Sequence, residues 1–178
     1  MPPRAAAADA RQWVAVSTPA ERPYAVIDID GVLADTSHRM HFLERGRKNW
    51  NAFFAAAADD PPLEIGVALA REWAAEHDLV WLTGRPEHLR RVTERWLRAQ
   101  RLPVPRLEMR PPDDRRPAKF FKADRLRALA AETEVAVVVD DDPEVVAELT
   151  HRGWPVYLAD WVPYADALRE AQERSGRT

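Results

Sequence analysis

The feature of this sequence that most constrains its fold is an alternation between short β-branched segments and longer segments of helical periodicity. The clearest β-branched segment is VAVVVD, at residues 135–140. A continuous run of valines without polar alternation is typical of a central strand that is covered on both faces. Strands that alternate with helices in this way form βα units on a parallel sheet. The pattern therefore predicts an α/β fold with a central, mainly parallel sheet.

The same pattern places the individual elements. The predicted strands cover residues 24–29, 79–83, 106–109, 135–140 and 155–158. Apolar residues at helical spacing predict helices around 63–74 and 89–96, with further helices over 117–130, 143–152 and 163–174. The segment 36–62 breaks the alternation directly after the first strand and has room for one or two short helices. Its position predicts an insertion at the mouth of whatever the strand ends build.

Length and composition limit the organisation and the chemistry. At 178 residues, the chain has the size of one domain, and we expect a flexible N-terminal arm over residues 1–21 followed by one domain over 22–178. The absence of cysteine excludes thiolate nucleophiles, zinc thiolate sites and disulfides. The net charge of −3 is no global signature of a nucleic-acid or membrane binder, and no apolar run resembles a signal peptide or a membrane span. We expect a soluble cytoplasmic protein; its oligomeric state stays open.

Polar residues gather where the predicted strands end, at the edge of the sheet where ligands bind in open parallel sheets. These residues, together with two lysines early in the helix after the third strand, are Asp28, Asp30, Thr83, Asp140, Asp141, Asp142, Lys119 and Lys122. Converging carboxylates without His or Cys suit a hard cation, and Mg²⁺ is the default. Because Mg²⁺ commonly shares phosphate oxygens, such a site predicts a phosphorylated ligand. A turn or a helix cap explains each motif alone; the order of the motifs points to a site.

At these positions the sequence resembles the haloacid dehalogenase (HAD) superfamily. VIDIDGVLAD, WLTGR, a downstream lysine and VVVDDD look like the four ordered motifs of that superfamily, over about residues 24–158. The resemblance implies a Rossmann-like three-layer sandwich and a Mg²⁺-dependent phosphatase. The insertion at 36–62 would then be a minimal cap that leaves an open cleft for a bulky substrate.

The resemblance also implies roles for the individual residues. Asp28 would be the nucleophile that becomes an aspartyl-phosphate, and Asp30 would be the general acid and base. Thr83 and the backbone amide of Gly84 would hydrogen-bond the phosphate, and the motif lysine would neutralise it. Mg²⁺ would bind Asp28, the backbone carbonyl of Asp30, Asp140 and Asp141, whereas Asp142 is interpreted as a helix cap.

A second resemblance concerns the segment MRPPDDRRPAKFFKADRL. It is similar to the stretch of polynucleotide 3′-phosphatase domains in which Arg, Asp and Arg precede the catalytic Lys. The matching residues are Arg110, Asp114, Arg116 and Lys122. This similarity favours Lys122 over Lys119 as the motif lysine, places Arg110 and Arg116 at the substrate, and implies a nucleic-acid 3′ end as the substrate.

Two further features bear on the substrate. The segment SHRMHFLERGRKNW interleaves basic groups, including Arg39, Arg45 and Arg47, with aromatic groups such as Trp50. It could hold a phosphate backbone and stack a base, or it could be a solvated helix face whose aromatic residues belong to the core. Arg85, which follows Thr83 and Gly84, could contact the substrate or brace an acidic loop.

Three functions remain open from the sequence. The first is a Mg²⁺-dependent phosphomonoesterase acting on DNA or RNA 3′ ends, without a kinase domain because no GxxxxGK[ST] motif occurs. The second is the same chemistry on a nucleotide or another small phosphate ester. The third is a non-catalytic module that binds Mg²⁺ and phosphate; the pair Asp28 and Asp30 argues against it, since a binding module needs no general acid.

Overall fold

The fold is given by a computed structural model, which describes residues 22–44 and 48–162. Three expectations lie outside the described residues: the arm over 1–21, the helix over 163–174, and the placement of Arg45 and Arg47 in the basic segment. The site predicted from the strand ends lies within the described part.

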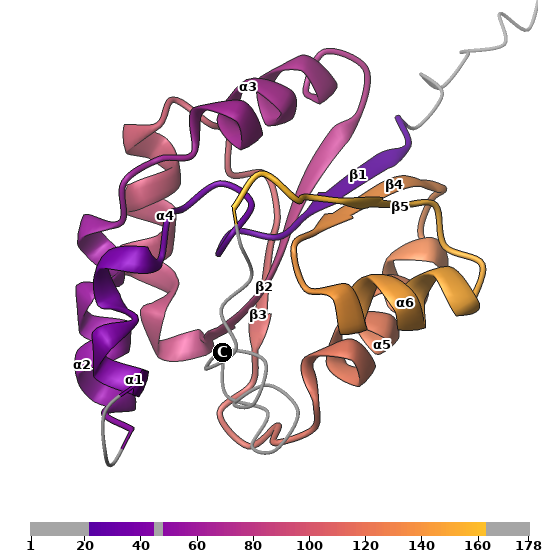
Figure 1. The fold of residues 1–178 in the computed structure, drawn as a ribbon. Helices are drawn as coiled ribbons and strands as arrows, with labels where there is room; N and C mark the ends of the chain where they lie inside the picture. Colours follow the sequence, from indigo (N-terminus) through magenta and orange to yellow (C-terminus); the bar gives the residue numbers. More distant parts are fainter. Residues whose placement is uncertain (1–21, 45–47, 163–178) are drawn as a thin grey trace, which may run out of the picture.

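Within the described residues, the fold is centred on a five-stranded sheet in which neighbouring strands run parallel (Figure 1). The order across the sheet is β3-β2-β1-β4-β5. The strands are β1 (Tyr24–Ile27), β2 (Asp78–Pro86), β3 (Leu107–Arg110), β4 (Val135–Asp140) and β5 (Val156–Leu158). Because the chain crosses from β3 on one side of β1 to β4 on the other, the ends of β1 and β4 flank the switch point where such sheets bind ligands.

Helices cover both faces of the sheet and confirm the predicted Rossmann-like α/β class. The helices α3 and α4 lie against one face, and α5 and α6 against the other (Figure 1). Short helices of the insertion extend the first of these layers. The α-helices are α1 (His41–Glu44), α2 (Trp50–Ala55), α3 (Glu64–Trp73), α4 (Arg90–Ala99), α5 (Ala118–Ala130) and α6 (Pro143–His151), and the 3₁₀ helices are η1 (Ser37–Arg39), η2 (Ala56–Asp59) and η3 (Glu87–Leu89).

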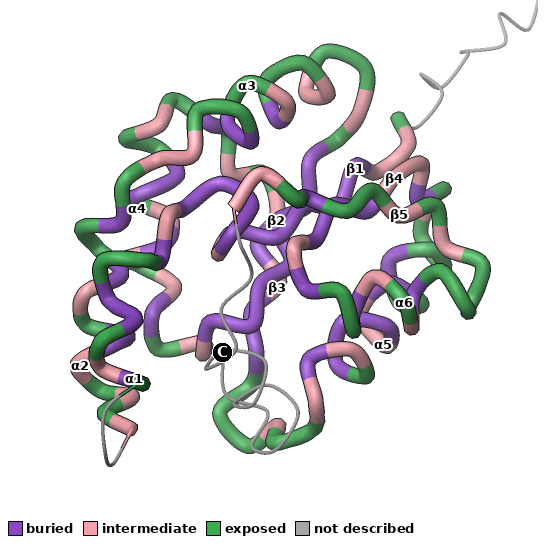
Figure 2. The backbone as a smooth tube through the Cα atoms, viewed as in Figure 1, coloured by how far each residue is buried: buried purple, intermediate pink, exposed green. Residues whose placement is uncertain are grey.

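Apolar side chains of β1 supply both cores, because successive residues of a strand point to opposite faces. Ala25 and Ile27 belong to the core beneath α3 and α4, whereas Val26 belongs to the core beneath α5 and α6. All three are buried, and Figure 2 shows the central strands buried while the outer sides of the helices are exposed. This double burial explains why the strands read as apolar runs.

The insertion at 36–62 forms the predicted short helices. Phe53 and Ala57 are buried, and Phe42 and Trp50 are partly buried against the same core. The insertion rejoins the body through a bridge between Ala34 and Pro62, so its helices lie beside the loop that follows β1. The predicted apolar face is therefore present, and it holds the insertion on the sheet.

One strand is longer than its predicted range of 79–83. β2 continues past Thr83 to Pro86, and its pairing with β3 shifts register between these two residues. The extension carries Gly84 and Arg85 over the end of β1, and α4 begins only at Arg90. The alternation in the sequence ended at Thr83 because glycine and proline are poor strand formers.

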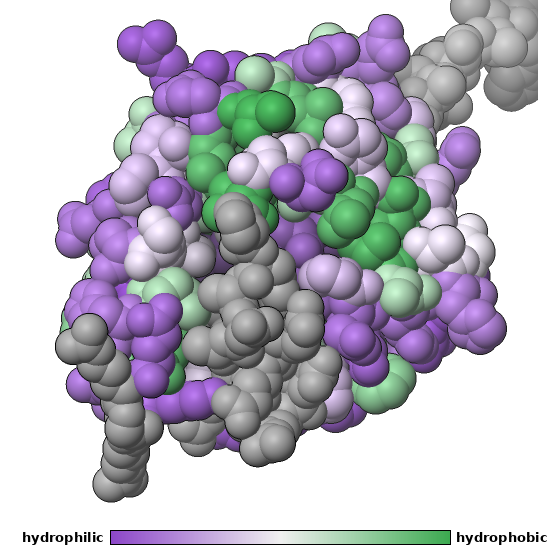
Figure 3. Space-filling model, in the orientation of Figure 1, coloured by the Kyte–Doolittle hydropathy of each residue, from purple (hydrophilic) through white to green (hydrophobic). Residues whose placement is uncertain are grey.

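The described residues contain no helix that is both long enough and apolar enough to cross a membrane. On the face drawn in Figure 3, hydrophobic residues gather over α3 and near β5, between hydrophilic helices. Exposed members of these regions are Ile65 on α3 and Tyr157 and Leu158 on β5. Tyr157 and Leu158 lie on the edge strand of the sheet, and Ile65 lies in the first turn of α3.

Candidate active site

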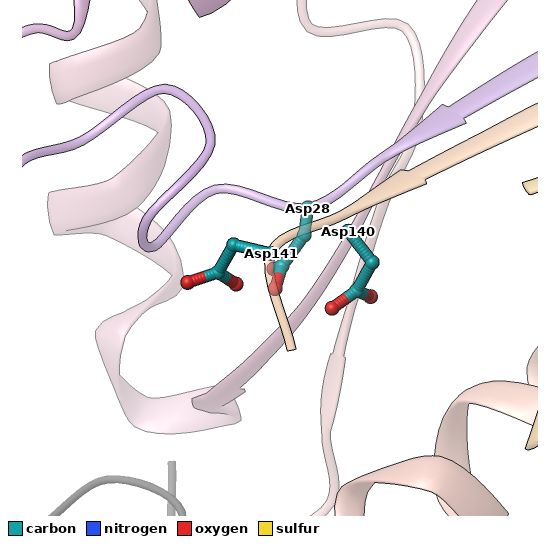
Figure 4. Close-up of side chains that lie close together, drawn as sticks. All are labelled: Asp28, Asp140 and Asp141. Carbon is teal, nitrogen blue, oxygen red and sulfur yellow. The ribbon is translucent and has the colours of Figure 1, made fainter. Parts of the chain in front are cut away.

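Three carboxylates meet beyond the ends of β1 and β4. Asp28 follows β1, Asp140 ends β4, and Asp141 comes next in the chain. Each offers a ligand oxygen, and these oxygens lie within 4.8 Å of one another. Figure 4 shows the three side chains directed into the same space beyond the strand ends. The parallel pairing of β1 with β4, extended by a hydrogen bond from Asp28 N to Val139 O of 2.9 Å, produces this convergence.

A buried lysine lies between two of these acids. Lys122 Nζ, on α5, donates to Asp28 Oδ2 and to Asp140 Oδ2, at 2.6 Å each. Burial alone would lower the pKa of Lys122, but the charges of Asp140 and Asp28 raise it above its usual value. The lysine is therefore a fixed cation. We call Asp28, Asp140, Asp141 and Lys122 the acidic cluster, since it groups three carboxylates with one ammonium.

When ionised, the three carboxylates of the acidic cluster carry more negative charge than the single ammonium of Lys122 balances. Burial raises the pKa of Asp28, although Lys122 opposes the shift. Burial, with the charge of Asp28, raises the pKa of Asp140 to about 7. Burial and the charges of Asp28 and Asp140 hold the pKa of Asp141 well above its usual value. Three oxygen donors with a surplus of negative charge are the donor set that a hard divalent cation requires.

The loop between β1 and the insertion has no room for a side chain at Gly31. Gly31 adopts a φ of 74°, and a Cβ there would lie 1.8 Å from Asp141 Oδ2. The turn therefore depends on glycine for its backbone conformation and for the space that Asp141 occupies. This close approach keeps the loop after β1 against the end of β4.

Asp30 belongs to a second group of buried charges. Its Oδ1 accepts hydrogen bonds from Arg39 Nη2 (2.8 Å), Arg85 Nε (3.0 Å) and Arg85 Nη2 (2.5 Å). The same two guanidinium groups donate to the buried carboxylate of Asp60. We call Asp30, Asp60, Arg39 and Arg85 the paired cluster, because two carboxylates face two guanidinium groups.

The paired cluster fixes the charge and orientation of Asp30. Burial would raise the pKa of Asp30, but the charges of Arg39 and Arg85 outweigh it and lower the pKa to about 2. All three hydrogen bonds are made to Oδ1, and no described residue donates to Oδ2. One oxygen is thus held by the protein, and the other remains available to a ligand.

Thr83 is fully buried at the bend in β2. Its Oγ1 accepts a hydrogen bond of 3.2 Å from the backbone N–H of Arg85, which leaves the hydroxyl proton for another acceptor. This bond holds the Gly84 turn closed against the strand. The predicted hydroxyl is therefore present at the strand end, on the strand next to β1.

Both guanidinium groups of the paired cluster serve as braces. Arg39 and Arg85 have no solvent-exposed surface. For Arg85 this is the second of the two roles considered from the sequence, the bracing of acidic groups. Arg39 belongs to the insertion and is buried, with its guanidinium 4.2 Å from the centre of the Phe53 ring, rather than on an open basic surface. The alternative interpretation of its segment, a solvated helix face, does not apply to Arg39, because this residue is buried.

The two candidate lysines separate clearly in space. Lys122 reaches the acids, whereas Lys119 Nζ donates to Glu144 Oε2 on α6 at 3.1 Å. Asp142 is the N-cap of α6 and accepts from the backbone N–H groups of Glu144 and Val145, which confirms its interpretation as a cap.

The two arginines of the second resemblance also differ. Arg110, at the end of β3, is buried, and its Nη1 donates to the carbonyl of Arg116 at 2.9 Å. The side chain of Arg116 is half exposed and pairs with Asp114 and Asp124. Arg110 therefore faces the interior beside Gly84, and Arg116 lies at the surface.

Asp60 is the residue that the sequence did not single out. Asp60 is buried, and its carboxylate accepts hydrogen bonds from Arg39 and Arg85. Its Oδ1 also lies 2.8 Å from Nε2 of His38. Its sequence context, two acids before two prolines, is typical of an exposed turn. One chemical signal was available. If Arg39 and Arg85 are both buried near Asp30, their two positive charges require a second carboxylate as counter-ion.

These side chains, on β1, β2, α5 and β4, follow the order of the four motifs that the sequence shares with the haloacid dehalogenase superfamily. Within that superfamily, residues 23–159 match the family described as the polynucleotide kinase PNKP phosphatase domain. The match extends over most of the chain, which therefore belongs to this family.

Relatives and solved structures agree with this assignment. A candidate nucleotidase from Halalkalibacterium halodurans is 32% identical over 81 residues, which are 40% of this chain and 42% of that protein. A chain from the Pnkp1/Rnl/Hen1 complex has a TM-score of 0.66 at 21% identity, over 81% of this chain and 47% of that chain. A class C acid phosphatase from Bacillus anthracis has a TM-score of 0.57 at 12% identity, over 85% and 78%. The two structures share the fold, and this chain spans less than half of the nucleotidase and of the complex chain.

Proposed function

We propose that the chain is a Mg²⁺-dependent phosphomonoesterase that works through an aspartyl-phosphate on Asp28 and removes phosphate from nucleic-acid 3′ ends. The observation that carries the chemical part is the surplus of carboxylate in the acidic cluster beside a carboxylate, Asp30, with one unbonded oxygen. The polynucleotide part is supported by the family to which residues 23–159 belong.

The residues at the strand ends fit Mg²⁺. Asp28, Asp140 and Asp141 supply oxygen donors only, and Asp30 adds a backbone carbonyl in the proposed ligand set. When bound, the cation would supply the positive charge that lets an anionic phosphate approach an anionic nucleophile. Lys122 orients Asp28 by holding Oδ2, which leaves Oδ1, bonded to the N–H of Ile29, on the other side of the carboxylate.

In this proposal, an oxygen of Asp28 attacks phosphorus, and the bond between phosphorus and the 3′ oxygen of the nucleotide breaks. A proton from Asp30 Oδ2 neutralises that leaving oxygen. At neutral pH Asp30 is ionised before substrate binds, since its pKa is about 2. A phosphate dianion brought beside it opposes the guanidinium charges and raises its proton affinity, so that Asp30 takes up a proton from solvent as substrate binds and can donate it to the leaving oxygen. Asp30 then takes the proton back from the water that hydrolyses the aspartyl-phosphate.

The other side chains hold the transferred group. The hydroxyl of Thr83 and the N–H of Gly84 lie at the end of β2, where they can donate to phosphate oxygens. Arg39 and Arg85 keep Asp30 in one orientation through the paired cluster. These groups are fixed before substrate arrives, so little reorganisation opposes the reaction.

Nucleotides are the second candidate substrate. The Halalkalibacterium halodurans relative is 32% identical over 81 residues, which supports a small nucleoside phosphate as an alternative. The two substrates differ in their response to salt: affinity for a polyanion falls steeply as salt rises, whereas affinity for a mononucleotide changes little.

The test measures phosphate release at near-neutral pH from a 3′-phosphorylated oligonucleotide, a 5′-phosphorylated oligonucleotide, a mononucleotide and p-nitrophenyl phosphate. Each is assayed with Mg²⁺ and with EDTA. We expect Mg²⁺-dependent release, fastest from the 3′ end and absent in Asp28→Asn. Activity that persists in EDTA or in Asp28→Asn would overturn the mechanism, and a preference for the mononucleotide would overturn the substrate.

A further inference from the structure

A pocket of about 290 Å³ opens beside the site. It lies between the insertion helix α2, the turn at the end of β2 and the loop after β3, and we call it the side pocket. Residues that matter for its chemistry are Trp50, Phe54, Gly84, His88, Arg110 and Asp114. Its volume is at the small end of the range for ligand pockets, which suits one nucleotide unit rather than a length of strand. Gly84 connects it directly to Thr83.

One wall of the side pocket is aromatic. The rings of Trp50 and Phe54 lie 5.7 Å apart with 32° between their planes, and His88 meets Phe54 edge-on at 6.3 Å. Phe54 is almost fully buried, whereas Trp50 keeps part of its surface exposed. A partly exposed indole held on a buried aromatic base is a rigid platform for a flat ring.

Another part of the lining carries a buried arginine. Arg110 is 3% exposed, and its Nε and Nη2 have no hydrogen-bond partner among the described residues. Its guanidinium is held 4.8 Å from the centre of the Phe121 ring and through Nη1 by the carbonyl of Arg116. Asp114 Oδ1 lies 3.7 Å from Arg110 Nη1, so this part of the lining combines a fixed guanidinium with a carboxylate.

We propose that the side pocket binds the nucleobase of the nucleotide that carries the 3′-phosphate. The proposal rests on the proposed function and narrows its substrate to an end with an intact terminal base. The aromatic wall takes the face of the base, and Asn51, Asp114 and Arg110 offer donors and acceptors to polar atoms of the base or sugar. A simple phosphate ester would leave both parts of the lining unused.

The first test changes the substrate and leaves the protein intact. Two 3′-phosphorylated oligonucleotides are compared, one ending in an ordinary nucleotide and one ending in an abasic sugar. Stacking on an aromatic side chain predicts a kcat/KM about 10-fold lower for the abasic end, through KM. Equal kcat/KM values for the two ends would overturn the proposal.

The second test changes the platform. Trp50→Leu should remove the difference in kcat/KM between the two ends, because it removes the aromatic platform on which the terminal base would stack. Trp73→Leu is the control, since Trp73 is another partly buried tryptophan and packs near Tyr157, away from the side pocket. A loss of base preference in both variants would overturn the role of Trp50.

Direct binding separates this proposal from the proposed function. Fluorescence anisotropy with the Asp28→Asn protein compares the same two oligonucleotides without turnover. Tighter binding of the ordinary end supports the side pocket even if the wild-type protein hydrolyses neither oligonucleotide. Hydrolysis of both ends with equal binding would keep the phosphatase and overturn the pocket. Failure to bind either oligonucleotide would overturn the pocket as a nucleotide site.

Discussion

Two groups of buried charge lie side by side after β1, and they are built on opposite principles. In the acidic cluster, three carboxylates lie close together, and the ammonium of Lys122 is bonded to two of them, Asp28 and Asp140. In the paired cluster, Asp30 and Asp60 face Arg39 and Arg85, and the charges balance. Asp28 and Asp30, with one residue between them, thus stand in environments that shift their pKa values in opposite directions.

The difference teaches what each group is for. A set of ion pairs in which the charges balance holds its members in place without a further counter-ion. A set with surplus carboxylate is complete only when another cation or a proton joins it. Stability should therefore depend on the paired cluster, and activity together with metal dependence should depend on the acidic cluster.

The largest expected effect is on activity. Asp28→Asn should lower kcat for phosphate release by about 10³-fold or more, because a nucleophile cannot be replaced by its neighbours. Its free energy of unfolding in EDTA should fall by no more than about 1 kcal/mol, since burial already disfavours the charge of Asp28. Phosphate release and urea denaturation measure the two quantities.

The control for this variant is Asp35→Asn, in which the carboxyl group lies in the same loop and accepts, among the described residues, only from the N–H of Ser37. It should keep nearly all activity. A large loss of stability in Asp28→Asn would contradict the division between the clusters.

The paired cluster should show the reverse. Asp60→Ala leaves Arg39 and Arg85 buried with a single carboxylate, and breaking a buried pair in this way costs about 3 kcal/mol or more. Urea denaturation of the variant and of Asp59→Ala, the exposed neighbouring acid, gives the comparison. Equal stabilities of the two variants would show that the paired cluster is not a stabilising element.

The next largest expected effect is the response of stability to Mg²⁺, which should depend on the acidic cluster and not on the paired cluster. Saturating Mg²⁺ should raise the free energy of unfolding of the wild type by about 2 kcal/mol, because the cation binds only the assembled carboxylates. Asp141→Asn should be as stable as the wild type or more so in EDTA, and it should lose most of the response to Mg²⁺. The exposed acid Asp160 supplies the matched control, Asp160→Asn. An unchanged Mg²⁺ response in Asp141→Asn would exclude that carboxylate as a ligand.

The smallest expected effect is the pH dependence of this response. The raised pKa of Asp140, about 7, means that the folded, metal-free protein holds a proton there and loses stability as pH rises from about 4 through 7. A cation replaces that proton. The Mg²⁺-induced gain should therefore be larger at pH 8 than at pH 5.5, by about 1 to 2 kcal/mol, in melts at several pH values. A gain that falls with pH would contradict the sign.

The sequence predicted the elements whose information is local. The valine run gave β4 its bounds, and the acids after it fell at the strand end because a parallel sheet brings its carboxyl ends together. A motif distinguished Lys122 from Lys119. Helical spacing is consistent with that choice, because a residue three positions later lies on nearly the same face of the helix but about one turn further along it.

The features that the sequence did not predict depend on pairing between distant segments. Nothing local distinguishes Asp60 from an exposed turn residue, because its burial results from Arg85, which is 25 residues away. The direction of Arg39 depended likewise on where the insertion packs. β2 was predicted too short because the strand continues through a register shift, which sequence periodicity does not reveal.

The bond from Lys122 to Asp28 joins residues 94 positions apart. During synthesis, β1 leaves the ribosome long before α5 and β4, so the nascent chain carries the nucleophile's carboxylate without its lysine or its partner acids. The complete site therefore forms only after β4 has paired with β1, which is a late step in the folding of the chain. A cation drawn to that site would select finished molecules from partly folded ones, and its binding would report that the chain has folded.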